Sequence, residues 1–121
     1  MHLQDQMQTE NIDLVFHTGI PQLTAVEPNA MIDRTRIVDT HVVVMEGWAT
    51  WTRNVKKTLH VYVADGSENM SAYAFERSDL SGRAGAKGFL LVAENPRAPI
   101  QPICVMILSG NNFYSLTGSA C

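Results

Sequence analysis

The chain has 121 residues, of which 45% are hydrophobic and 17% charged, and its formal net charge is -3. This length is typical of one compact domain, and the hydrophobic content is too high for a disordered chain. A protein that binds nucleic acid carries a surplus of basic residues, which this mildly acidic sequence lacks. We therefore expect no nucleic-acid partner. The sequence predicts a polar N-terminal arm, flexible or briefly helical, over residues 1–11 and a single domain over residues 12–121.

Neither membrane insertion nor export is expected. The longest apolar run, residues 103–108, is far shorter than the roughly 20 residues of a membrane-spanning helix. The N-terminus also lacks the cationic start and apolar segment of a secretory signal. Of the two cysteines, Cys104 lies within the apolar run and Cys121 is the last residue. We expect two free thiols, with a disulfide as the alternative, and a cytoplasmic location, because small secreted domains usually carry more cysteines.

Short segments rich in β-branched and aromatic residues predict strands along the chain. Residues 22–34 show no sustained period and predict a connection, which could hold one short strand over residues 23–27. Clean alternation on both sides of a Gly-containing loop predicts a β-hairpin between residues 58–63 and 70–77. The expected strands are residues 12–18, 36–46, 58–63, 70–77, 88–94, 103–108 and 113–116. This pattern predicts an all-β fold, a single antiparallel β-sandwich of seven to eight short strands.

The sequence contains no catalytic or metal-binding motif that we can identify, and we expect no metal and no cofactor. Its histidines do not follow a metal-ligand spacing, although His17, His41 and His60 could meet from three strands. We expect Asp39, within an apolar strand, to face solvent beside His41. The sequence therefore predicts a protein that is not an enzyme. A small β-barrel enzyme or ligand-binding barrel would need a cavity lined by Asp39, His41 and His60.

Exposed aromatic residues provide a second hypothesis. Sugars stack on aromatic rings, and the candidate platforms are Trp51, Tyr62 and Tyr73. Against this, one tryptophan of the Trp48–Trp51 pair can fill the core while the other covers an edge. A carbohydrate-binding module therefore stays an alternative.

One constellation goes beyond composition. Gly47-Trp48 ends a predicted strand, Arg77-Ser78-Asp79-Leu80 follows a hairpin, and Gly88-Phe89 begins the next strand. This order resembles small immunoglobulin-like β-sandwich domains found beside bacterial glycosyltransferase modules. The resemblance implies structural roles: Gly47 permits a turn beside the ring of Trp48, which would fill the space between sheets. Arg77 and Asp79 would bridge a loop, and Gly88 would allow close approach before Phe89 enters the core.

These observations favour a non-catalytic accessory or interaction domain, from a bacterial protein that handles carbohydrate or surface polysaccharide. Its expected partner is a neighbouring domain or a second copy bound through a sheet edge, with a glycan as a further candidate. An exposed strand edge presents unpaired backbone groups that can bond another chain.

Overall fold

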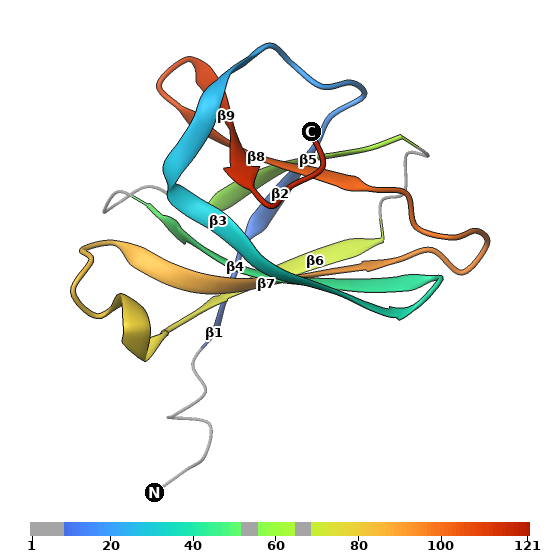
Figure 1. Ribbon diagram of the computed structural model, residues 1–121, viewed down its shortest axis with the longest axis horizontal. Coiled ribbons are helices and arrows are strands. Elements are labelled where there is room, and N and C mark those ends of the chain that lie inside the picture. Colours follow the sequence, from blue (N-terminus) through green and yellow to red (C-terminus); the bar gives the residue numbers. More distant parts are fainter. Residues whose placement is uncertain (1–8, 52–55, 65–68) are drawn as a thin grey trace, which may run out of the picture.

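The computed structural model describes residues 9–51, 56–64 and 69–121. These ranges form nine strands and one short 3₁₀ helix, η2 (Ser78–Leu80), which confirms the predicted all-β class (Figure 1). The strands are β1 (Thr9–Asn11), β2 (Asp13–Phe16), β3 (Leu23–Asp39), β4 (Val42–Thr50), β5 (Thr58–Val63), β6 (Met70–Phe75), β7 (Ala86–Glu94), β8 (Ile103–Ser109) and β9 (Asn112–Thr117).

All nine strands belong to one hydrogen-bonded sheet, in the order β1-β6-β7-β4-β3-β9-β8-β5-β2. Six of its eight pairings are antiparallel, while β2–β5 and β3–β9 are parallel. The sheet curls into a nearly closed barrel, with β4, β6 and β7 on one side and β5, β8 and β9 on the other (Figure 1). The architecture is thus one mixed sheet, and the strands do not separate into the two antiparallel sheets that the sequence predicted.

The N-terminal strands join the two ends of this sheet. β1 pairs with β6, and the next residue, Ile12, donates its backbone N–H to the Ala72 carbonyl at 2.9 Å. The chain then crosses to β5, with which β2 pairs in parallel. Residues 9–11, expected within a polar arm, are therefore a strand that helps to close the barrel, while residues 1–8 lie outside the described residues.

β3 replaces the connection that the sequence predicted over residues 22–34. It passes from the side of β9 to the side of β4, and its register shifts between Glu27 and Met31 (Figure 1). Pro28 falls within this irregular stretch, where a missing N–H is tolerated. The prediction of one continuous strand over residues 36–46 is wrong, because these residues belong to two strands, the end of β3 and the start of β4. A turn at Thr40 and His41 separates β3 from β4, since the Asp39 carboxylate accepts the His41 backbone N–H at 2.6 Å.

The predicted hairpin between residues 58–63 and 70–77 is also wrong. Both strands exist, but β5 pairs with β8 and β2, whereas β6 pairs with β7 and β1. Local alternation reports which face of a strand is buried but not which strand lies beside it. The loop expected between them falls mostly at residues 65–68, outside the described residues.

The core fills the barrel interior with side chains from every strand except β1. Phe89 and Leu91 of β7 and Leu59 and Val61 of β5 are completely buried. Because these residues alternate with more exposed ones on β7, that strand shows the inward and outward pattern of a sheet with one buried face. The remaining members of the core are Ile12, Ala30, Ile32, Val43, Met45, Ala49, Trp51, Val63, Ala72, Ala74, Ala93, Ile103, Val105, Ile107 and Leu116, with Leu14 of β2 packed against it.

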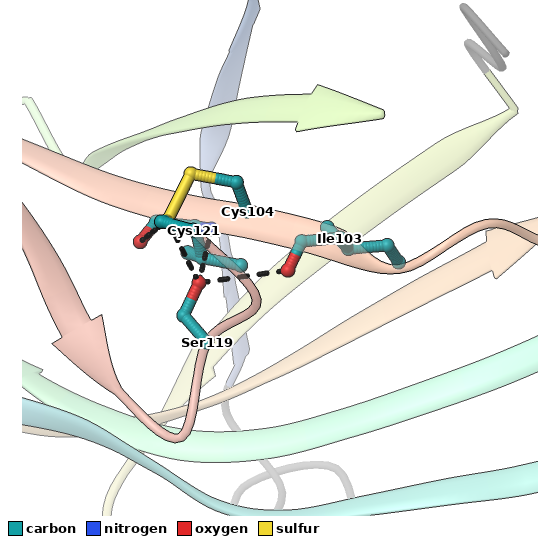
Figure 2. Close-up of a disulfide and its surroundings, with 5 residues drawn as sticks. Ile103, Cys104, Ser119 and Cys121 are labelled. Atoms are coloured by element: carbon teal, nitrogen blue, oxygen red, sulfur yellow. Dashed lines mark hydrogen bonds between the residues drawn. A yellow bond between two sulfur atoms is a disulfide. The ribbon is translucent and has the colours of Figure 1, made fainter. Parts of the chain in front are cut away.

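The C-terminal tail is bonded to β8. Cys104 and Cys121 form a disulfide with a Cα–Cα distance of 4.6 Å, so the expectation of two free thiols is wrong (Figure 2). The Ala120 N–H donates to the Ile103 carbonyl at 3.1 Å, and the Val105 N–H donates to the Ser119 hydroxyl at 2.6 Å. The spacing of these cysteines along the chain does not reveal that a single turn after β9 returns Cys121 to β8.

Reduction of the Cys104–Cys121 disulfide should lower the free energy of unfolding by about 3 kcal/mol, the value expected for a loop of this length. The measurement is urea unfolding of the native chain with and without a phosphine reductant. The Cys121→Ser variant should match the reduced protein and should not respond to the reductant. Equal stability of oxidised and reduced protein would contradict the role given to this bond.

Candidate functional site

The second half of β3 has an open backbone edge. Its first half bonds β9 as far as Met31, and its second half bonds β4 from Ala30 to Asp39. Among the described residues, no backbone hydrogen bond reaches residues 33–39 from the side opposite β4. We call residues 33–39 the open edge. It ends where Gly118 lies against the Ile32 carbonyl and where Thr40 accepts the Ile100 N–H at 2.9 Å.

An apolar groove runs beside the open edge. It has a volume of about 240 Å³ and is bounded by β3 and β4 on one side and by the β7–β8 loop and the C-terminal tail on the other. Ile37 is 70% exposed there, because no strand of the described residues covers this part of β3. The lining residues are Thr35, Ile37, Val43, Met45, Ile100, Gln101, Pro102, Ile103, Gly118 and Ala120. We call this feature the edge groove.

The disulfide helps to form one wall of the edge groove. Gly118 and Ala120 belong to the tail that Cys121 anchors beside β8 (Figure 2). The tail thereby occupies the backbone edge of β8 that faces β3, since the Ile103 carbonyl and the Val105 N–H both bond it. One border of the gap between the two sides of the barrel is therefore the edge of β8, which bonds the tail, and the other border is the open edge of β3.

The first half of β3 also has one edge without a strand, but it is less suited to pairing. Pro28 lacks a backbone N–H, and the Glu27 carboxylate accepts the Asn29 N–H at 3.0 Å within the irregular stretch. Proline and local bulges are devices that protect an edge from pairing with another chain. The open edge contains neither proline nor glycine, and its central residues 34–37 pair with β4 in one continuous register, with shifts only on either side of them, at Asp33 and Val38.

The three aromatic residues proposed as sugar platforms are not brought together. Trp51 is 8% exposed and belongs to the core, where its indole N–H donates to the Thr58 carbonyl at 3.4 Å. It borders a separate cavity of about 420 Å³. Tyr62 of β5 is half-buried and Tyr73 of β6 is 38% exposed. Because β5 and β6 lie on different sides of the barrel, these two rings do not form one platform with Trp51 (Figure 1).

The Gly-Trp and Gly-Phe segments face each other across β4 and β7. Gly47 is opposite Phe89, and Trp48 is opposite Gly88, so each ring lies across from a glycine. Phe89 is fully buried in the core. The resemblance implied that Trp48 fills the space between two sheets, but Trp48 lies outside the main core. It packs in a separate cluster with Leu80, under the guanidinium of Arg83 at 4.8 Å from the ring centre.

Arg77 connects three parts of this region. Its guanidinium donates two hydrogen bonds to Asp79, at 3.0 and 2.7 Å, and it also bonds Asp33 of β3 and the Gly47 carbonyl of β4. These two bonds join the pair of residues for which the resemblance implied a bridge. The side-chain hydrogen bond from Arg77 lowers the pKa of Asp79. Gly88 leaves room for Arg77, because a Cβ there would overlap the arginine side chain.

The histidines form a pair and a separate turn contact. His17, which follows β2, shares a hydrogen bond with His60 of β5, with 2.9 Å between Nε2 and Nδ1. Phe113 makes T-shaped contacts with both rings, with ring centres 5.2 and 5.1 Å apart. His41 lies on the β3–β4 turn beside the exposed Asp39, 4.0 Å from its carboxylate. The cavity lined by Asp39, His41 and His60 that a ligand barrel would need is therefore not formed by these contacts.

The described residues contain no group of three or more His, Cys, Asp or Glu side chains placed to hold a metal ion. In the same part of the chain, no helix has the length and apolar character needed to cross a membrane. Comparison of the chain with protein-family models, with curated proteins and with solved structures gave no match. The open edge and the edge groove are therefore the features that bear on function.

The open edge is the part of the site that sequence reasoning missed. Residues 22–34 were expected to be a connection, and residues 36–46 one continuous strand. Polar Arg34 and Arg36 alternate with Thr35 and Ile37, which is the pattern of a strand with one apolar face. That signal was available, but nothing local indicates that β9 would leave β3 at Met31.

Replacing Gly47 by Ala should destabilise the fold by about 1–3 kcal/mol, the usual cost of overpacking. The added methyl group would overlap the Met31 carbonyl oxygen and lie 2.8 Å from the Phe89 ring. Gly82→Ala is the matched control, because its Cβ would meet nothing within 4 Å. Urea unfolding of both variants measures the difference, and a Gly47→Ala variant as stable as the control would refute the packing role.

Stability should fall as the pH decreases below about 6.5. Burial lowers the pKa of His60, and the neighbouring His17 lowers it further. Between the folded and unfolded pKa values the unfolded chain binds more protons, so the free energy of unfolding rises with pH in that window. Urea unfolding at pH 7.5 and pH 5.5 checks this.

Two variants identify the source of that pH dependence. His17→Gln keeps a hydrogen-bonding side chain but removes the second imidazolium, so the loss of stability on acidification should be smaller. His41→Gln, at the exposed turn, should leave the loss unchanged. An equal loss in wild type and His17→Gln would show that the pair does not act as described.

Proposed function

We propose that the chain is a non-catalytic interaction domain that binds an extended segment of a partner protein, which adds as a strand to the open edge. The single observation that carries this proposal is the unpaired backbone of residues 33–39 beside the edge groove. In strand addition, main-chain hydrogen bonds supply affinity while pockets for alternate side chains supply specificity. Both components are available at this site.

The dimensions support a peptide more than a small molecule. Residues 33–39 span about 23 Å at roughly 3.3 Å per residue, enough to pair with a short strand. The edge groove holds about 240 Å³, below the roughly 300–1,000 Å³ that is usual for small-molecule pockets. It suits one or two aliphatic side chains, which would lie against Ile37 and Met45 and project from alternate residues of an added strand.

A partner segment is favoured over a second copy of this chain. Two copies of the open edge pair around a two-fold axis when their strands run antiparallel. If the axis passes beside Thr35, Arg34 of one copy lies opposite Arg36 of the other. If it passes beside Arg36, the Arg36 residues of the two copies lie opposite each other. Like charges directly opposite each other destabilise a strand pair. Self-association through this edge was the sequence-based alternative and becomes an outcome of the test.

Other expectations from the sequence stay predictions. An accessory role beside a glycosyltransferase module is compatible with an interaction domain, and its motif residues take up packing positions on β4 and β7. Binding of a glycan is not favoured by the buried Trp51. A cytoplasmic location also stays a prediction. The Cys104–Cys121 disulfide is an argument for an oxidising compartment, because disulfides rarely persist in the cytosol.

The Ile37→Lys variant should abolish strand addition. The probe is a capped peptide of seven residues that alternates Val and Thr, titrated into the isotopically labelled protein. In wild type, binding should slow the amide hydrogen exchange of those residues in the range 33–39 whose N–H groups face the peptide. A lysine at residue 37 would place an ammonium group in the apolar edge groove, where the inward side chains of the peptide must lie, so the affinity should fall by at least about tenfold.

Val38→Lys is the matched control for this experiment. This substitution adds the same charge one residue away, at a side chain that is 59% exposed and does not line the edge groove. It should retain binding, and both variants should unfold at the wild-type urea concentration. Unchanged exchange at the open edge in wild type, or equal losses in the two variants, would overturn the proposal.

A further inference from the structure

We infer that the partner segment carries acidic side chains on alternate residues, facing Arg34 and Arg36, with apolar side chains between them in the edge groove. This inference rests on the proposed strand addition and specifies the chemistry of the partner. It follows from the two faces of the open edge, one apolar and one basic.

The strand register assigns these faces. Thr35 lies opposite Met45, and Ile37 lies opposite Val43. Residues directly opposite each other in a sheet project from the same face. Because Met45 and Val43 are buried in the barrel, with 3% and 9% of their surface exposed, Thr35 and Ile37 face inward.

The two arginines take the other face. Arg34 lies opposite Glu46 and Arg36 opposite Val44, and both of these β4 residues are half-buried between the more deeply buried Val43, Met45 and Gly47. The arginine side chains therefore project to the outside of the barrel along the open edge. A strand added there would place its own outward side chains about 4.5–5.5 Å away, at Cβ, from those of Arg34 and Arg36.

The charges near this edge favour an acidic strand. Arg34 and Arg36 are exposed, and neither takes part in an ion pair among those of the described residues. Asp33, at the start of the open edge, is already bound by Arg77. Two carboxylates share that face: Glu46 lies opposite Arg34, and Asp39 lies opposite Val42 at the end of the open edge, where it accepts the His41 backbone N–H. Arg34 and Arg36 are therefore the two cations at the centre of the open edge, with one carboxylate beside Arg34 and one at the edge's end. This basic pair contrasts with the net charge of -3 of the whole chain.

Strand geometry then determines the sequence pattern of the partner. Side chains of an added strand point alternately inward and outward, with a period of two. Inward positions meet Ile37 and the aliphatic walls of the edge groove. Outward positions meet the two guanidinium groups, which carboxylates bind well through charge-assisted hydrogen bonds. A segment of about five residues, alternating apolar and acidic, satisfies both faces at once.

Three peptides separate this inference from strand addition itself. All are capped and seven residues long, with Val at one set of alternating positions and Glu, Thr or Lys at the other. At low salt the Glu peptide should bind wild type about five- to tenfold more tightly than the Thr peptide, since each cross-strand charge pair contributes a small amount. The Lys peptide should bind most weakly. Raising the salt concentration to 0.5 M should shrink these differences.

Charge reversal on the protein gives the second readout. Arg36→Glu should remove the preference for the Glu peptide, and the double variant Arg34→Glu/Arg36→Glu should prefer the Lys peptide. Arg97→Glu is the matched control for the single variant, because Arg97 is exposed on the β7–β8 loop and changes the net charge equally. It should keep the wild-type order of affinities.

The outcomes are distinguishable. Equal binding of the Glu and Thr peptides at low salt, with slowed exchange in residues 33–39, would overturn the acidic partner while strand addition stands. If no peptide slows that exchange, both the proposed function and this inference fail. Sedimentation of the free protein adds a further test, because a dimer that protects the open edge without peptide would identify a second copy as its occupant and overturn the inference.

Discussion

β3 runs through both sides of the barrel, bonded to β9 in its first half and to β4 in its second (Figure 1). This change of partner lets one sheet of nine strands enclose a common core, since it joins the two sides at one seam while β1 and β2 join them at the other. Within residues 9–51, 56–64 and 69–121, it also leaves the backbone of residues 33–39 without a hydrogen-bonded strand on the side facing the C-terminal tail. The closed core and the open edge are therefore consequences of the same strand.

Two further features hold this arrangement in place. Glycines of β4 and β7 lie opposite aromatic rings of the partner strand, which lets the strands approach while the rings fill both faces. Arg77 then ties β3, β4 and η2 together through Asp33, Gly47 and Asp79. On the far side of the gap, the disulfide keeps the C-terminal tail on β8. The edge groove is thus bounded by parts of the fold that are each fixed by specific bonds.

Part of the candidate site could be predicted from the sequence and part could not. The alternation of Arg34, Thr35, Arg36 and Ile37 is visible without a structure and describes a strand with one basic and one apolar face. Sequence reasoning nevertheless ended a connection at Arg34, because residues 22–34 show no sustained period. It then carried one strand over residues 36–46, because the turn at Thr40 and His41 contains no glycine or proline. The wall formed by Gly118 and Ala120 depends on the Cys104–Cys121 disulfide, and the sequence did not decide whether these two cysteines are bonded or free.

The sequence by itself determined the all-β class and the positions of most strands, because the side-chain period of two is a local property. Only the tertiary structure decided which strands lie side by side. β5 and β6 have the alternation and loop of a hairpin, yet each finds its partners elsewhere in the chain. Pairing is decided by the packing of the whole core and not by neighbouring residues. For the same reason, the open edge exists only in the folded barrel, at the point where β9 ends its pairing with β3.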